Sequence, residues 1–215
     1  MKIGIIGATG KVGSNILNEA KMRNHDITAI SRNKNVLSNM KINVLEKEIF
    51  ELTKEDVTQF DVLINAFGAF PGEELLHVKV GRFLISLLKN SETKLFVVGG
   101  AGSLFMDNGY KIRLLELPEF PKEYKLIAHQ QLQNLIDLQN STIRWTFLSP
   151  SPLFDSDGPR TGHYILGKDR LLLNSQHLSY VSYADYAVAV LDEIENPRHE
   201  NAHFTVASEN ATTAS

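Results

Sequence analysis

Residues 2–13 read KIGIIGATGKVG, and the rest of the fold can be worked out from this stretch. Its first half, Ile3 to Ile6, is a short run rich in β-branched residues, which is typical of a buried strand. Three glycines follow at positions 7, 10 and 13. Apolar residues at helical spacing, from Val12 to Ala20, come next and predict a helix. The stretch therefore predicts a strand, a tight glycine turn and a helix in immediate succession.

The same alternation continues along the chain. Apolar runs bounded by turn formers lie at residues 27–30, 62–64, 95–98 and 143–148, and a closing strand is expected at 203–207. Three more stripes at helical spacing lie among them: Leu76, Val80, Phe83, Leu84, Leu87 and Leu88; Tyr124, Ala128, Leu132, Leu135 and Ile136; Tyr183, Tyr186, Ala187, Val190, Leu191 and Ile194. Strands that alternate with helices need right-handed crossovers, which produce a parallel sheet covered on both faces. We therefore predict a single α/β domain over residues 1–207 with a doubly wound parallel sheet, the Rossmann arrangement.

One segment, at about residues 149–180, breaks the alternation with prolines, glycines and short strand-like pieces. A long irregular insertion at the carboxyl end of a late strand is where this fold places residues that contact a substrate, so we predict a small C-terminal substrate lobe. Ser182, with Asp185 three residues later, resembles a capping box at the start of the last helix. The small polar residues 208–215 are expected to form a flexible tail.

Composition excludes several classes of function. The chain has 215 residues, 22 basic and 25 acidic side chains, and no cysteine, so disulfides, thiolate metal sites and cysteine nucleophiles are excluded. A net charge of -3 gives no general footprint for nucleic acid or an anionic membrane. No apolar run approaches the ~20 residues of a membrane span. We expect a cytoplasmic protein whose partner is a small molecule, with a homo-oligomer left open.

The glycine turn is a candidate dinucleotide site. Free amides in the first turn of a helix, together with its positive dipole end, face an anion, and Gly10 lets the backbone approach a pyrophosphate. The candidate contacts are Gly7, Ala8, Thr9, Gly10, Lys11, Val12 and Gly13. The alternative is a structural turn with no ligand. A phosphate-binding P-loop is excluded, because Val12 stands where that loop needs Ser or Thr.

The end of the second strand indicates which dinucleotide binds. An NAD site usually presents a carboxylate to the ribose about 20 residues after the glycines. Here the strand ends with Ser31, Arg32 and Asn33. Arg32 can form a fork with a 2′-phosphate, and its neighbours can add hydrogen bonds, so NADP(H) is favoured over NAD(H). The alternative for Arg32 is a solvated surface side chain.

Three further strand ends are candidate cofactor contacts. Ala66, Phe67 and Gly68 follow the fourth strand, although Phe67 can equally be a core residue. Gly99, Gly100 and Ala101 follow the fifth, where clustered glycines indicate backbone close to a ligand. Glu48 and Ile49 follow the third and could hold the adenine.

The residues resemble those of a known superfamily over nearly the whole chain. Its most specific pieces are residues 7–13, 31–33, 97–103, 145–150, 160–164 and 183–187. The chain is similar to the atypical short-chain dehydrogenases/reductases, in the NmrA-like and biliverdin-reductase-B-like branch, and within it most of all to the NADH-flavin reductases. The resemblance implies NAD(P)H binding and hydride delivery to a flavin, FMN or riboflavin.

The chain departs from that superfamily at its catalytic pair, Tyr-x-x-x-Lys. The helix after the fifth strand has Tyr124 followed by Ala128 at this spacing, and the formal match, Tyr164 with Lys168, lies in the irregular insertion. Alcohol–ketone and sugar-epimerase mechanisms are therefore disfavoured. Flavin reduction tolerates this loss, since it requires chiefly that two rings be stacked. NADP(H) sensing through a protein partner, without turnover, remains the alternative function.

The substrate side is expected to use polar and aromatic residues near the insertion. Ser103 is the candidate catalytic contact to the substrate ring, or else it satisfies the backbone of its own turn. Pro150, Ser151, Pro152, Leu153, Phe154 and Tyr164 are the candidate pocket wall, or else a loop packed on itself. His199 to His203 spells the zinc-protease pattern His-Glu-x-x-His, but a helix ends before it and no metal site is expected.

Overall fold

The structure, a computed structural model, describes residues 1–70 and 72–209, apart from the side chains of Val36 and Asn39. Its main sheet has the order β3-β2-β1-β4-β5-β6-β10-β8. The strands are β1 (Lys2–Ile6), β2 (Asp26–Ser31), β3 (Asn43–Glu46), β4 (Val62–Asn65), β5 (Lys94–Val98), β6 (Trp145–Ser149), β8 (Tyr164–Gly167) and β10 (Ala202–Ser208). Neighbouring strands are parallel except β8, which runs antiparallel to β10. The predicted doubly wound sheet is confirmed.

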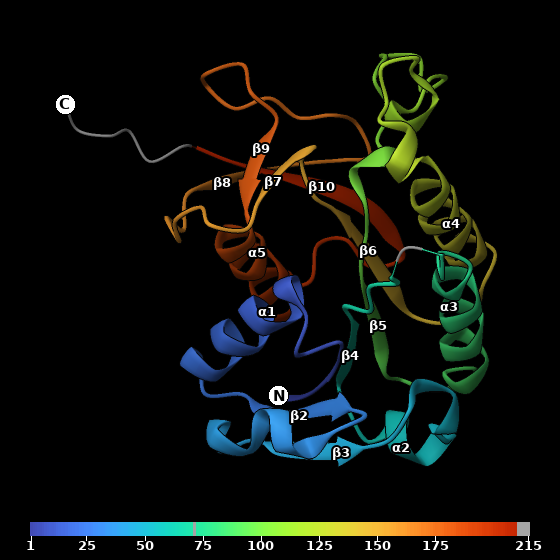
Figure 1. Cartoon of the computed structure of the whole chain (residues 1–215), viewed down its shortest axis with the longest axis vertical. Helices are drawn as coiled ribbons and strands as arrows, with labels where there is room; N and C mark the ends of the chain where they lie inside the picture. Colours follow the sequence, from blue (N-terminus) through green and yellow to red (C-terminus); the bar gives the residue numbers. More distant parts are fainter. Residues whose placement is uncertain (71, 210–215) are drawn as a thin grey trace.

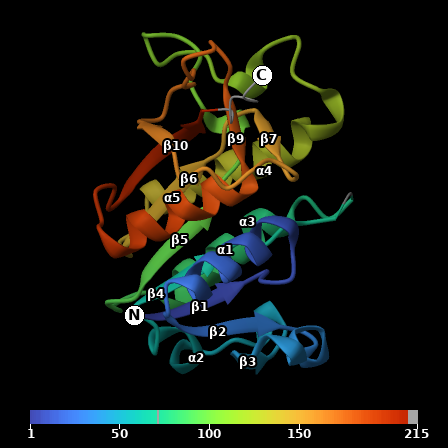
Figure 2. The ribbon, with the colours of Figure 1, turned by 90° about the vertical axis from the view of Figure 1, so that its left-hand side faces the viewer.

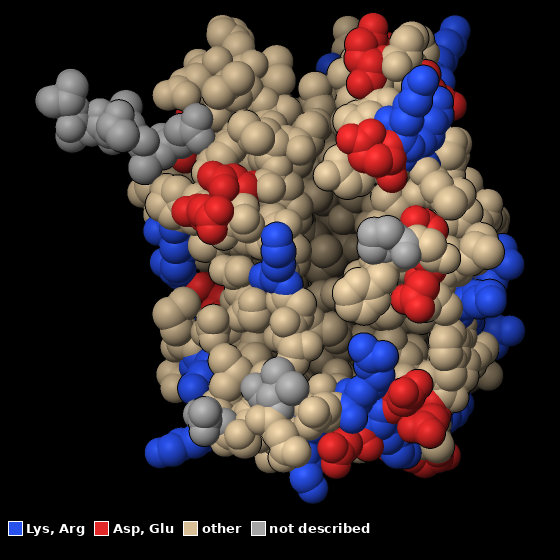
Figure 3. Space-filling model, in the orientation of Figure 1, with Lys and Arg blue, Asp and Glu red and all other residues tan. Residues whose placement is uncertain are grey.

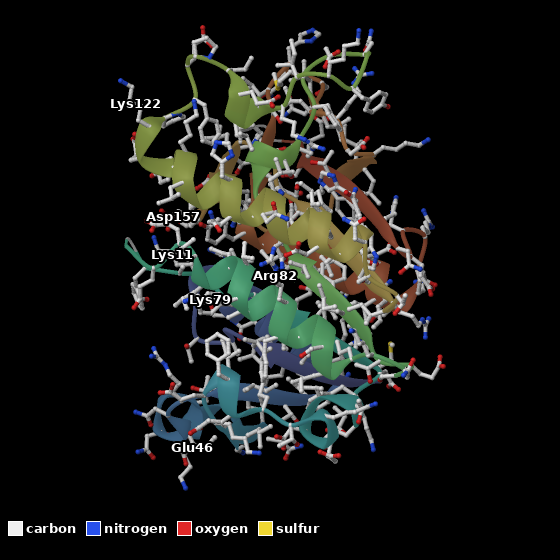
Figure 4. All side chains as sticks on the ribbon, turned by 90° about the vertical axis from the view of Figure 1, so that its right-hand side faces the viewer. Lys11, Glu46, Lys79, Arg82, Lys122 and Asp157 are labelled. Carbon is white, nitrogen blue, oxygen red and sulfur yellow. The ribbon has the colours of Figure 1, made fainter. Side chains whose placement is uncertain are left out.

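Helices cover both faces of this sheet (Figures 1 and 4). On one face, α1 (Lys11–Met22) packs against α5 (Tyr183–Glu195), and their apolar sides join one core cluster with β1. On the other, α3 (Leu76–Leu87) lies beside α4 (Lys122–Gln139) over a second cluster that includes Leu63, Leu95 and Phe147. A short helix, α2 (Lys54–Thr58), follows the second of four 3-10 turns: η1 (Lys34–Met40), η2 (Ile49–Glu51), η3 (Ala101–Ser103) and η4 (Leu114–Glu116).

The irregular segment contributes to two sheets. Its strand β8 pairs with β10 and so extends the main sheet, because Leu166 and Val206 lie opposite each other in register. Strand β7 (Leu153–Asp155) pairs with β9 (Tyr180–Ser182) in a separate two-stranded sheet. The sequence placed the tail at 208–215, but Ser208 is a buried residue of β10. Residues 210–215 of that tail lie outside the described residues.

The start of α5 shows why the predicted capping box is only half formed. The Ser182 hydroxyl caps the helix by accepting from the Asp185 backbone N–H at 2.9 Å. The Asp185 carboxylate does not return to this cap. It accepts instead from the Thr161 N–H and hydroxyl and from the Gly162 N–H, at 2.6–2.8 Å. The helix start therefore holds the loop between β7 and β8.

An ion cluster around the buried carboxylate of Glu19 fixes the same loop to α1. Arg160 forms two hydrogen bonds, of 2.8 and 2.9 Å, with the buried carboxylate of Glu19 on α1. Arg23 bonds to Glu19 as well and reaches Asp192 on α5. Figure 2 shows α1 and α5 side by side. Ion pairs thus connect the loop between β7 and β8 to the helix that follows the glycine turn.

The contact between the glycine turn and α1 gives a stability prediction. A Cβ on Gly13 would lie 2.0 Å from the Gly7 carbonyl oxygen, a backbone atom that cannot move aside. We expect Gly13→Ala to lower the free energy of unfolding by about 1–3 kcal/mol, measured by urea denaturation. Gly68→Ala is the matched control, since a Cβ there meets no atom within 4 Å. Equal losses for both variants would contradict this account of Gly13.

Candidate functional site

A deep cavity lies at the carboxyl ends of the central strands. Its volume is about 1220 Å³, and Figure 3 shows the hollow between the two halves of the molecule, with uncharged side chains on its floor. One end is lined by residues after β1, β2 and β3. The other end is lined by the connection from β5 to α4 and by the segment after β6. The order of the sheet reverses between β1 and β4, which is where ligands bind in doubly wound folds.

The glycine turn, which follows β1, forms part of the cavity wall. Gly7 has φ +76°, and a Cβ there would lie 2.4 Å from the Ala66 carbonyl oxygen, so no other residue fits without strain. The Gly10 N–H donates to the Gly7 carbonyl at 2.9 Å. Gly10 is also the N-cap of α1, which has no side-chain cap and no acid in its first turn. The amides of that turn suit a diphosphate, and the residues present therefore fit a dinucleotide.

Two residues of the predicted turn support it from behind. Thr9, Lys11 and Val12 line the cavity with Gly7 and Gly10. Ala8 is 1% exposed and packs in the core, and Gly13 is the contact point between helix and turn. Neither lines the cavity, so their contribution is to the shape of the turn.

The turn after β2 places Arg32 at the cavity wall, together with Ser31 and Asn33. The side chains of these two neighbours bond within their own loop. The Ser31 hydroxyl donates to the Asn33 carbonyl at 3.2 Å, and the Asn33 carboxamide oxygen accepts from the Asn35 N–H at 2.9 Å. Their observed role is to hold the loop that presents the exposed Arg32 guanidinium.

Glu48 and Ile49 line the same end of the cavity, as expected, and two residues beside them were not anticipated. Lys47 lines the wall while its ammonium group bonds to Asp56 at 2.6 Å. Phe50 lies against Phe83 of α3, with ring centroids 5.4 Å apart. A lone lysine and a lone phenylalanine carry no sequence signal, so only the packing of η2 on α3 reveals them.

The segment after β4 lines the cavity and also contributes to the core. Ala66, Phe67 and Gly68 line the cavity, and Phe67 also packs on the core beneath α3. The Phe67 ring meets His77 edge-on at 5.6 Å. His77, also in the wall, was not anticipated; burial lowers its pKa to about 4, so the imidazole is neutral near pH 7.

The segment after β5 runs along the cavity at Gly99, Gly100, Ala101 and Gly102. Side chains packed against this segment leave no space for a Cβ at Gly99 or Gly100. At Gly99 a Cβ would lie 2.1 Å from the Phe147 ring, and at Gly100 it would lie 2.0 Å from the Gln131 carboxamide oxygen. The prediction that the backbone itself forms this wall agrees with the close approach of these atoms.

Ser103, the candidate catalytic contact, is not at the cavity surface. Its side chain is turned inward, the residue is 2% exposed, and its hydroxyl donates to the Gly100 carbonyl at 2.9 Å. The expected contact with a substrate ring is therefore wrong, and the alternative, that Ser103 satisfies its own turn, describes the structure. The cause is η3, which curls the chain back toward β6.

The opposite end of the cavity is largely apolar and aromatic. Pro150, Ser151, Pro152 and Phe154 line it, and the Phe154 ring lies 4.1 Å from that of Tyr183. Leu153 does not line it, because alternation along β7 turns that side chain outward, where it is 54% exposed. Tyr164 is not there either: it donates to Asp192 from β8, on the α5 side. These two pocket assignments are corrected.

A second wall of this end was missed by the sequence interpretation. It consists of Leu114, Leu117, Glu119, Phe120, Pro121, Tyr124, Ile127, Ala128 and Gln131, from η4 and the start of α4. Tyr124 begins the apolar stripe predicted for the core, yet it is 60% exposed. It lines the cavity instead of packing in the core. The spacing of these residues does not distinguish a cavity wall from a core stripe, and only the three-dimensional path of the connection does.

The Tyr164–Lys168 pair and the pattern from His199 to His203 both lie outside the described cavity wall. His199 stacks on Phe204 and bonds to Glu193, whereas His203 bonds to Ser149. Residues 1–70 and 72–209 contain no group of three or more histidines and acids that could hold a metal ion. In the same residues, no helix is both long and apolar enough to cross a membrane.

Three proteins are similar to this one over almost the entire chain. The uncharacterized protein YwnB of Bacillus subtilis (strain 168) is 57% identical over 211 residues, which are 97% of this chain and 99% of YwnB. The structure of a "putative NADH-flavin reductase" from Streptococcus pneumoniae is 40% identical, with a TM-score of 0.92, covering 97% of this chain and 100% of that one. A "putative epimerase" from Bacteroides thetaiotaomicron is 32% identical, with a TM-score of 0.83 and 96% of each chain covered.

The family comparison covers the same region as the cavity. Residues 7–197 match the model of the family described as NAD(P)H-binding, and the match begins at the first glycine of the turn. The resemblance to the atypical short-chain dehydrogenases/reductases is thereby confirmed, and the chain belongs to the NAD(P)H-binding family.

Proposed function

We propose that this protein is an NADPH-dependent oxidoreductase that reduces a flat, conjugated acceptor such as riboflavin or FMN. The observation that carries the proposal is the continuity of the cavity, which joins the glycine turn and Arg32 to an aromatic compartment. Pockets for one small ligand have volumes of roughly 300–1,000 Å³, and this one, at about 1220 Å³, has room for a cofactor and an acceptor together.

Each end of the cavity suits one of the two molecules. At the cofactor end, the first-turn amides of α1 can hold the diphosphate, and Arg32 can form a fork with a 2′-phosphate. At the acceptor end, Phe120, Phe154 and Tyr183 offer ring faces and edges against which a flat molecule can stack. The glycine segment after β5 lies between these ends and leaves room for close approach of two rings.

The proposed reaction requires little acid–base catalysis by residues of the chain. A nicotinamide ring, when bound, supplies a hydride. The residues of the chain hold two flat molecules at reacting distance and exclude water from the compartment. The reduced acceptor can take its proton from solvent. The Tyr-x-x-x-Lys pair is therefore unnecessary, which agrees with Ala128 in the position where the lysine would stand on α4.

The names of the relatives refer to two different reactions, and the residues of the cavity favour one of them. The Streptococcus pneumoniae protein is named for flavin reduction and the Bacteroides thetaiotaomicron protein for epimerisation. Epimerisation requires a positioned acid and base at the substrate carbon. Burial lowers the pKa of His77 to about 4, which makes its imidazole a weak base, and Tyr124 has no lysine partner at the expected spacing, so reduction of a conjugated ring is favoured.

Turnover tests the proposal directly. We expect the protein to oxidise NADPH, followed by the loss of absorbance at the nicotinamide band, when riboflavin, FMN or a quinone is added in turn. Calorimetry with NADPH alone provides the binding control. Tight NADPH binding without turnover on any acceptor would contradict the proposal and favour an NADP(H) sensor that acts through a protein partner.

Arg32 tests the choice of cofactor. We expect Arg32→Ala to weaken NADPH binding by about 1–3 kcal/mol, because a charge-assisted pair with the 2′-phosphate is lost, and to leave NADH binding nearly unchanged. Calorimetry with both cofactors measures the difference. Lys34→Ala is the control, since Lys34 is in the same loop but outside the described wall. An equal loss for both cofactors would assign Arg32 a structural role.

Tyr124 tests the acceptor compartment. We expect Tyr124→Ala to raise KM for the acceptor about 2- to 10-fold through the loss of aromatic contact, while the Kd for NADPH stays constant. Steady-state kinetics and calorimetry give the two values. Leu126, 52% exposed on the same helix and outside the described wall, provides the control as Leu126→Ala. Identical KM changes in both variants would remove Tyr124 from the acceptor site.

A further inference from the structure

A chain of polar groups, in which Ser103 and Ser149 are buried and His203 is half-buried, stands directly behind the glycine wall of the cavity. The Ser149 hydroxyl, at the end of β6, lies 2.8 Å from the His203 Nε2 on β10 and 2.8 Å from the Ser103 hydroxyl. Both serine hydroxyls also lie within 3.0 Å of the Gly100 carbonyl oxygen. The chain thus runs from β10 through β6 to the cavity wall.

The number of available protons indicates the direction of this chain. The Gly100 carbonyl only accepts, and the two serines bring two protons to five contacts of 2.8–3.3 Å. If His203 carries its proton on Nε2, it donates to Ser149, which donates to Ser103, which donates to Gly100. That tautomer supplies a third proton and leaves fewer of these short contacts without one. The geometry therefore favours the Nε2–H form of His203.

The surroundings hold His203 in its neutral form. Burial, with the positive charge of Arg113 as a second cause, lowers the pKa of His203 to about 3. Its ring meets the Phe147 ring edge-on at 5.4 Å, and Phe147 is the residue that fills the space behind Gly99. Arg113 in turn donates to the Ser103 carbonyl. The same group of side chains therefore supports both ends of the glycine wall.

The wall is fixed on its other side as well. Gln131 of α4 lies against Gly100, and Ala128 lies against Gly102. Gly100 also lines the cavity between the glycine turn and the aromatic compartment. A displacement of the Gly100 carbonyl would therefore change the space in which the two reacting rings meet.

We propose that Ser103, Ser149 and His203 are positioning residues, whose hydroxyl–imidazole chain holds the Gly100 peptide and so sets the approach of the two rings. The inference rests on the proposed function for its kinetic consequence alone. Its structural part concerns the protein without any ligand.

The first experiment uses the ligand-free protein and Ser149→Ala, which removes the middle of the chain. The Ser103 and Leu104 backbone amides donate to the Gly100 and Ala101 carbonyls in the same turn. We expect their hydrogen exchange to be about 10-fold faster in the variant, because opening of this turn no longer breaks the serine contacts. Thr146→Val is the matched control: Thr146 is a buried hydroxyl on the same strand, bonded to the His199 carbonyl.

Nitrogen-15 spectra of the unmodified protein give a second measurement that does not depend on the folding of a variant. We expect His203 to show the Nε2–H tautomer. A proton on Nδ1 alone would overturn the proposed direction of the chain.

Kinetics separate positioning from general stability. With NADPH and the best acceptor, we expect Ser149→Ala to lower kcat about 10-fold while the Kd for NADPH stays within about twofold, because small misplacements slow reaction without removing remote contacts. Thr146→Val should leave both unchanged. Unchanged exchange, or faster exchange with unchanged kcat, would overturn the proposal. If the unmodified protein reduced no acceptor, the proposed function would fail, and exchange would still decide whether the chain holds the wall.

Discussion

The rest of the site depends on one close approach of main chain to main chain. The glycine turn touches the end of β4 at Ala66 and the first turn of α1 at Gly13, both at distances that a side chain would prevent. This contact brings β1, β4 and α1 together at the point where the sheet order reverses. The amides that suit a diphosphate are free there because Gly10, as the N-cap, has no side chain with which to cap the helix.

Ion pairs and hydrogen bonds then connect the loop between β7 and β8 to the helix that follows this turn. Arg160, in the loop between β7 and β8, bonds to Glu19 on α1, and Asp185 at the start of α5 holds the next two residues of that loop. Largely because of the hydrogen bond from Arg160, with Arg23 also contributing, the pKa of Glu19 is lowered despite its burial. The segment that lines the cavity after β6 leads into a loop anchored on α1, the helix that follows the glycine turn.

The parts of the site that could be predicted are those in which the backbone needs a particular residue type. Gly7 and Gly13 are readable because their geometry excludes a side chain, and the strands are readable because they are buried on both faces. The acceptor end follows a different logic. Tyr124 and Ala128 have the spacing of a core stripe, and only the path of the chain from β5 to α4 brings them to the cavity. Ser103 failed for the same reason, because the direction of its side chain depends on η3 and on its partners Ser149 and His203.

This division bears on how one fold could support different acceptors. At the end of the cavity formed by the glycine turn, a side chain on Gly7 or Gly13 would collide with backbone atoms, so substitutions there alter the turn itself. At the acceptor end the wall consists of side chains from long connections, such as Phe120, Tyr124 and Phe154, which can change without moving the strands. Relatives at 40% and 32% identity keep the fold while their names refer to different reactions. A glycine turn beside a wall built of side chains is a physical arrangement that permits this difference.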